Sequence, residues 1–172
     1  MRLKLSKYAI LVALAGLLAL PAGGCGDDDD DAPADVAGDY SINVTNRENG
    51  CGFENWQEGE STTAIPLAVT QQDSDVEGVI GGAVGVYMNV VLGSNTFSGS
   101  ASGNSVTLTL IGRAMMEGNC AYTLNATLHG VLQDDVLTGT IEYTRATNDN
   151  PDCAPLEGCV SRQEFNGARP PS

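Results

Sequence analysis

The sequence predicts an all-β domain: an antiparallel up-and-down meander of about eight strands, closed into a barrel and braced by two disulfides. Apolar and polar residues alternate with period two in short segments, as in strands with one buried face. Very short connections alternate strictly with long ones, which places every long loop at one end of a meander. Four cysteines all fall at that end. A two-sheet β-sandwich fits the same alternation and is the alternative fold.

The expected strands follow one another from residue 37 onward, separated by turn residues. They lie near residues 40–45, 64–70, 76–80, 97–101, 105–110, 122–132, 136–144 and 160–168. Alternation is weakest in the last strand, where Phe165 is expected to point inward. A helix of no more than one or two turns is expected within residues 83–92.

The connections are the basis for the topology. Tight hairpins are expected at 73–74, 103–104 and 134–135, where Asp, Ser, Gly and Asn favour two-residue turns. Long loops are expected at 46–63, 82–94, 112–119 and 146–158.

The N-terminus has the three parts of a secretion signal over residues 1–24. Basic residues precede an apolar run at 9–20, which is too short to cross a bilayer as a helix. Ala22-Gly23-Gly24-Cys25 resembles the lipobox of bacterial lipoproteins, which implies cleavage before Cys25 and acylation of that cysteine. The alternative is an ordinary cleaved signal with a free cysteine nearby.

Residues 25–36 are expected to form the lipidated cysteine and an acidic disordered linker, and residues 37–172 the β-barrel domain. After cleavage the chain would keep five arginines, no lysine and 22 acidic residues, a formal charge of about −17. Such a surface repels nucleic acid and anionic headgroups. Membrane attachment would therefore come from the acyl chains on Cys25, placing the protein in the cell envelope, at the outer membrane or cell surface rather than the inner membrane.

An even number of remaining cysteines in an exported domain indicates two disulfides. The cysteines are Cys51, Cys120, Cys153 and Cys159. Three pairings are open, and the expected one joins Cys153 to Cys159 around a short loop and Cys51 to Cys120. Their spacing and the single histidine, His129, do not fit a structural zinc site.

The domain resembles lipocalin-like and avidin-like barrels, which open with Gly-x-Trp at the closed end. Gly38-Asp39-Tyr40 stands at the start of the first strand here. Lipocalins cover that end with an arginine from the last strand, and Arg169 is placed to do so. The resemblance covers residues 37–170 and implies an up-and-down barrel, without functional residues to carry over.

The first long loop holds the best binding candidates, Phe53, Glu54, Trp56 and Glu58. Aromatic residues at a barrel mouth suit a ligand site, but Phe53 and Trp56 would equally suit a plug of the open end. A weaker calcium candidate is the Asx-rich segment with Asp149 and Asp152.

We expect no catalysis and no cofactor, because the domain has no lysine, no cysteine expected to stay free and one histidine. The leading hypothesis is a lipid-anchored, non-catalytic module that binds an unknown ligand at the long-loop end of the barrel. The alternative is a structural or surface-interaction lipoprotein whose barrel is filled.

Overall fold

The computed structural model describes residues 32–170, and eight of its strands form a closed, antiparallel, up-and-down barrel. The expected signal peptide and Cys25 lie outside the described residues. The strands are β1 (Gly38–Asn49), β2 (Ser61–Gln72), β3 (Asp75–Ile80), β4 (Thr96–Ser102), β5 (Ser105–Leu110), β6 (Ala114–Glu117), β7 (Cys120–Gln133), β8 (Val136–Thr147) and β9 (Val160–Ala168).

The pairing of β5 with β7 closes the barrel, since β1 already joins β2 on one side and β9 on the other. The prediction of a closed barrel is confirmed, and the sandwich alternative is wrong. The architecture is the one that the lipocalin-like and avidin-like resemblance implied.

Three two-residue turns form the short-connection end, as predicted. The flanking pairs are Gln72↔Asp75, Ser102↔Ser105 and Gln133↔Val136. Asp134 and Asp135 both adopt positive φ, at 49° and 64°. This is the backbone of a type I′ turn, whose twist matches that of the flanking strands.

The inward-facing residues of the eight strands form one hydrophobic core. Phe165 is buried, as predicted for the last strand. The fully buried large side chains include Ile42, Leu67, Phe97, Leu108, Leu110 and Leu128.

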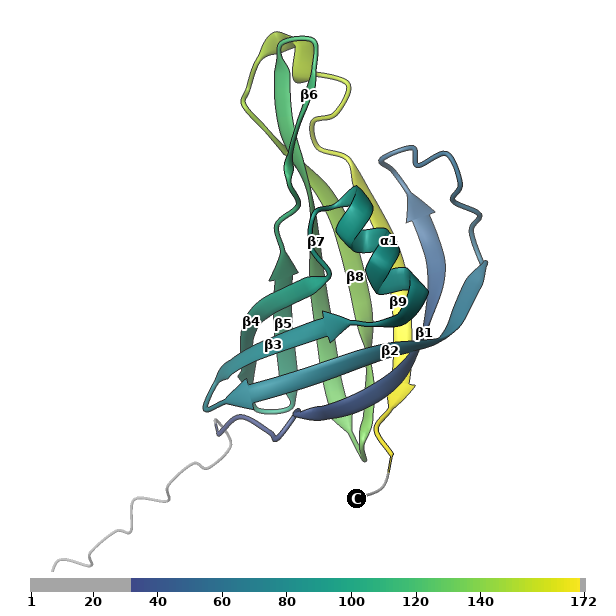
Figure 1. Ribbon diagram of the computed structural model, residues 1–172, viewed down its shortest axis with the longest axis vertical. Coiled ribbons are helices and arrows are strands. Elements are labelled where there is room, and N and C mark those ends of the chain that lie inside the picture. Colours follow the sequence, from purple (N-terminus) through teal and green to yellow (C-terminus); the bar gives the residue numbers. More distant parts are fainter. Residues whose placement is uncertain (1–31, 171–172) are drawn as a thin grey trace, which may run out of the picture.

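Helix α1 (Gly82–Val91) connects β3 to β4 and lies at the open end of the barrel (Figure 1). It is longer than the one or two turns expected, because packing rather than local propensity stabilises it. Met88 is buried in the core, and Gly85 packs so closely on the Ile80 carbonyl that a side chain would collide with it. Within residues 32–170, no helix has the length and apolarity to cross a bilayer.

The long-loop end contains one strand that the sequence did not predict. β6 pairs with the first residues of β7 and forms a hairpin that projects beyond the barrel (Figure 1). The expected loop at 112–119 is therefore largely the outer arm of this hairpin. Its tip is held by the short 3₁₀ helix η2 (Pro151–Cys153).

The closed end is covered as the lipocalin-like resemblance implied. Tyr40 is buried and donates to the Val36 carbonyl at 2.9 Å. Arg169 Nη1 donates to the Ala37 carbonyl at 2.8 Å, and its Nε donates to Asp135 at 2.7 Å. The last strand is thereby tied to the entry of the first and to the β7–β8 turn.

All four cysteines form disulfides at the long-loop end, but the expected pairing is wrong. The bonds are Cys51–Cys159 and Cys120–Cys153, with Cα–Cα distances of 4.8 and 5.0 Å. The expectation weighed separation along the chain, whereas barrel closure decides the pairing. Because β9 pairs with β1, Cys159 lies beside Cys51. Helix η2 places Cys153 next to Cys120, at the tip of the β6–β7 hairpin.

Candidate functional site

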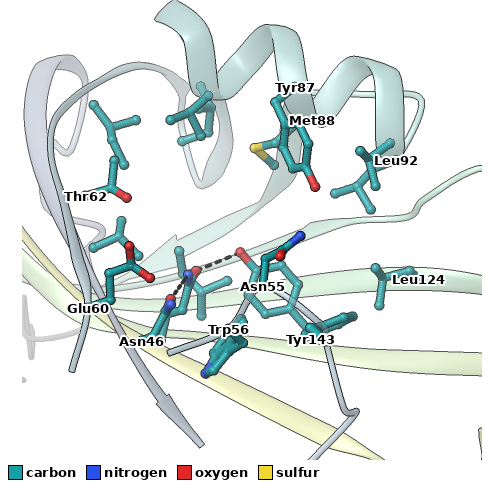
Figure 2. A pocket seen from close by; sticks show the side chains of 18 of the residues that line it. Asn46, Asn55, Trp56, Glu60, Thr62, Tyr87, Met88, Leu92, Leu124 and Tyr143 are labelled. Carbon is teal, nitrogen blue, oxygen red and sulfur yellow. Dashed lines mark hydrogen bonds between the residues drawn. The ribbon is translucent and has the colours of Figure 1, made fainter. Parts of the chain in front are cut away.

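A cavity of about 720 Å³ occupies the open end of the barrel. Protein interiors are packed with few voids larger than a water molecule, so this space is not ordinary core. Its volume lies in the range of small-molecule sites. The cavity lies between α1 and the loop that joins β1 to β2 (Figure 2).

The part of the cavity that faces the barrel core is apolar. The barrel strands contribute large aliphatic and aromatic side chains, and α1 closes the opposite side with its own apolar residues. These residues are Ile42, Val44, Ile65, Ile80, Phe97, Leu128 and Ile141 from the strands, and Val84, Met88 and Val91 from α1.

Three polar side chains also line the cavity and form a chain of hydrogen bonds, which are the dashed lines in Figure 2. The Tyr143 hydroxyl donates to Gln163 Oε1 at 2.8 Å, and Gln163 Nε2 donates to Asn46 Oδ1 at 2.7 Å. They come from β8, β9 and β1, which are neighbours in the barrel. Pairing among themselves satisfies groups that would be costly to bury alone.

Tyr143 stays neutral under ordinary conditions. Burial raises the pKa of Tyr143 from 10.0 to about 12, since the phenolate would lose its hydration. The hydroxyl therefore keeps its proton and remains the donor to Gln163.

An aromatic cluster forms the wall of the mouth. The ring centroid of Phe53 is 5.6 Å from that of Trp56, and both rings meet Tyr143 edge-on at 6.0 Å. The guanidinium carbon of Arg145 lies 5.8 Å from the Phe53 centroid. Phe53 and Trp56 are partly buried, line the cavity and leave it open, so they do not fill the mouth.

The first half of the β1–β2 loop is held to β1 and to the start of β9. Asn49 donates to the Phe53 carbonyl at 2.9 Å and accepts from the Phe53 amide at 2.8 Å. Trp56 Nε1 donates to the Arg47 carbonyl at 3.2 Å. The Cys51–Cys159 disulfide anchors the same loop to the start of β9. These bonds position the aromatic cluster over the barrel.

The two charged residues among those that line the cavity are acids, Glu54 and Glu60. Glu54 was expected in the site, whereas Glu60 was not among the sequence candidates. Glu58, which was, is exposed and does not line the cavity. The three glutamates thus share one loop, but it turns Glu58 away from the cavity.

The Asx-rich segment of the calcium candidate is engaged in holding the projecting hairpin. Asp152 accepts from Asn119 at 2.8 Å, and the amide of Asp152 donates to Asn150 at 3.0 Å. Asp149 has a positive φ of 58° in the turn before η2. Over residues 32–170, no three His, Cys, Asp or Glu residues are grouped to hold a metal ion.

His129 lies on the outer face of β7, where its Nδ1 is 3.3 Å from the Thr107 hydroxyl. It is exposed and is not among the cavity residues. The cavity therefore offers apolar surface, amides, hydroxyls and two carboxylates, which suit binding and orientation of a ligand.

Sequence reasoning missed most of the polar mouth, although a signal for it was present. Asn46, Tyr143 and Gln163 continue the inward faces of their strands by one more step of two residues. Asn46 and Tyr143 lie two residues after Val44 and Ile141, and Gln163 lies two residues before Phe165. A polar residue at an inward position next to a long loop is the pattern that indicates a mouth rather than a core.

Comparison with known proteins found no matching family, no matching curated sequence and no matching solved structure.

Proposed function

We propose that this protein is a lipid-anchored, non-catalytic carrier or receptor that binds a small, largely apolar molecule in its barrel. The observation that carries the proposal is the cavity of about 720 Å³, apolar below and polar at the mouth. An apolar ligand entering such a space would be removed from water over most of its surface, and hydrophobic burial would supply the binding energy.

The polar mouth supports binding of an amphipathic molecule rather than a plain hydrocarbon. Asn46 ends the hydrogen-bonded chain beside Glu60, and the Thr62 hydroxyl also lines the cavity (Figure 2). Polar groups placed at one end of an apolar pocket fix the orientation of a ligand. The apolar part of the ligand would then point toward the closed end.

The lipid anchor is part of the proposal on sequence grounds, from Ala22-Gly23-Gly24-Cys25. Two disulfides are typical of an exported protein. The Ala34 amide donates to the Gly103 carbonyl in the β4–β5 turn at 2.8 Å, so the described chain enters at the closed end. A tether attached there would leave the mouth facing away from the membrane that holds it, accessible to ligand.

The alternative function, a structural lipoprotein with a filled barrel, predicts no uptake of small molecules. The two are separated by titration with the neutral apolar dye N-phenyl-1-naphthylamine, whose emission rises in an apolar site. We expect one dye per wild-type protein. Leu124→Trp, which places a larger ring among the residues that line the cavity, should weaken binding. Val131→Trp, on the exposed face of the same strand, should preserve it. Absence of dye binding to the wild type would refute the proposed function.

A further inference from the structure

The charge of the cavity mouth is negative without a compensating cation in its lining. Among the described residues that line the cavity, Glu54 and Glu60 are charged, and Arg, Lys and His are absent. Neither glutamate belongs to an ion pair within residues 32–170. The mouth therefore presents two carboxylates to whatever enters.

The nearest arginines are occupied or lie outside the lining. Arg47 is paired with Glu164 at 2.6 Å on the outer surface. Arg145 stacks over Phe53, and Arg113 packs beside Gly93 after the end of α1. None of these three lines the cavity, so the lining itself offers an anion no partner of opposite charge.

The aromatic residues at the mouth add a second, independent preference for positive charge. Phe53, Trp56, Tyr87 and Tyr143 all line the cavity, from the β1–β2 loop, α1 and β8. The faces of aromatic rings attract cations, most strongly for tryptophan. The protein itself provides an example, because the Arg145 guanidinium already lies over Phe53.

We infer that the ligand of this cavity is an amphipathic cation: an apolar body that carries an ammonium group. The inference rests on the proposed function, because it specifies the ligand of the same cavity. The body fills the apolar barrel, and the ammonium stays at the mouth between the aromatic rings and the carboxylates of Glu54 and Glu60. The three N–H donors of a primary ammonium match the acceptors that this rim offers.

The same arrangement disfavours anionic amphiphiles such as fatty acids. A carboxylate at the mouth would be placed near the exposed side chains of two glutamates, and like charges repel each other. A neutral alcohol of the same chain length avoids this repulsion but gains no ion pair. The expected order of affinity is therefore amine, then alcohol, then acid.

The test is competition for the bound N-phenyl-1-naphthylamine by decylamine, decanol and decanoic acid at pH 7. These probes each contain ten carbons in an unbranched chain and differ in the head group. We expect decylamine to displace the dye at a concentration about tenfold below that of decanoic acid, because the amine gains attraction to the rings and carboxylates while the acid is repelled by the carboxylates. Displacement at equal concentrations, or most effectively by the acid, would overturn the inference.

Variants assign the preference to the mouth. Glu54→Gln/Glu60→Gln should bind the dye as before but lose the preference for decylamine over decanol. Glu58→Gln/Glu157→Gln removes the same charge from exposed loop positions outside the cavity and should keep it. An unchanged preference in the first variant, or equal loss in both, would overturn the inference. Failure of the wild type to bind the dye would instead refute the proposed function.

Discussion

Tyr143 and Gln163 are joined by a hydrogen bond of 2.8 Å between the adjacent strands β8 and β9. The bond lies next to the apolar part of the cavity, on the side toward the open end. Gln163 passes the chain to Asn46 on β1. The barrel thus has a packed apolar core toward its closed end. Toward its open end it has a cavity with an apolar lining and a hydrogen-bonded mouth. The account of function depends on this division.

The raised pKa of Tyr143 predicts a pH dependence of stability. Because the folded state favours the neutral phenol, its contribution is fully present below pH 10 and is lost as the pH rises toward 12. At about 1.4 kcal/mol per pKa unit, the loss is at most about 2–3 kcal/mol. Urea unfolding of the wild type at pH 8 and pH 11 measures the part that is lost by pH 11, about 1.4 kcal/mol.

Tyr143→Phe is the matched control, because it keeps the ring in the aromatic cluster and removes the ionisable group. This variant should lose less stability between pH 8 and pH 11 than the wild type. The slope that remains belongs in part to Tyr40, whose pKa is also raised by burial. Identical slopes for the two proteins would contradict the burial of the Tyr143 hydroxyl.

Trp56 should matter more for binding than for folding. Its ring is partly buried and its Nε1 donates one hydrogen bond of 3.2 Å. We expect Trp56→Ala to cost about 1–2 kcal/mol of unfolding free energy, below the 3–5 kcal/mol typical of a fully buried tryptophan. Dye affinity should fall clearly, whereas Trp56→Phe should retain most of it. A loss of 3–5 kcal/mol in urea unfolding would instead identify Trp56 as a plug of the barrel.

The two disulfides should have separable effects. Cys51–Cys159 closes 108 residues and fixes the binding loop, whereas Cys120–Cys153 closes 33 residues and braces the projecting hairpin. Chain-entropy estimates give about 4–5 and about 3–4 kcal/mol respectively. We expect Cys51→Ser/Cys159→Ser to weaken dye binding, and Cys120→Ser/Cys153→Ser to lower stability with affinity retained. Peptide mapping without reduction checks the pairing, and a Cys153–Cys159 peptide would contradict it.

The sequence was sufficient to predict the barrel because strand faces and hairpin turns are determined by residues that are close together in the chain. Alternating residues such as Val106, Leu108 and Leu110 define a strand face, and turns such as Asp134-Asp135 define the hairpins. Both depend on interactions between residues close in the chain or directly paired. The resemblance to lipocalin-like barrels placed Tyr40 and Arg169 at the closed end, where they meet.

The disulfide pairing and the cavity depend on contacts between residues that are far apart in the chain. Local sequence patterns do not show these contacts. Cys51 meets Cys159 because the first and last strands are neighbours, and chain separation gives the opposite expectation. α1 became a wall of the cavity although its apolar residues, such as Val86 and Val90, surround the helix rather than marking one face. The way in which α1 packs on the barrel shows which of its apolar residues face the cavity.

Lipidation is expected to depend on Cys25. Cys25→Ser should yield a protein that takes up no fatty-acid analogue during metabolic labelling and no longer sediments with membranes. The domain itself should fold unchanged, because residues 32–170 contain the complete barrel. Label or membrane retention in this variant would contradict the lipoprotein prediction.

Native mass spectrometry of the protein purified from the organism that makes it tests the central claim, that the barrel is a container, most directly. The account predicts that the wild type carries a non-covalently bound small molecule, released on activation in the gas phase. Leu124→Trp, purified in parallel, should carry less of it, and Val131→Trp should retain it. A wild type that carries no bound small molecule would contradict the claim.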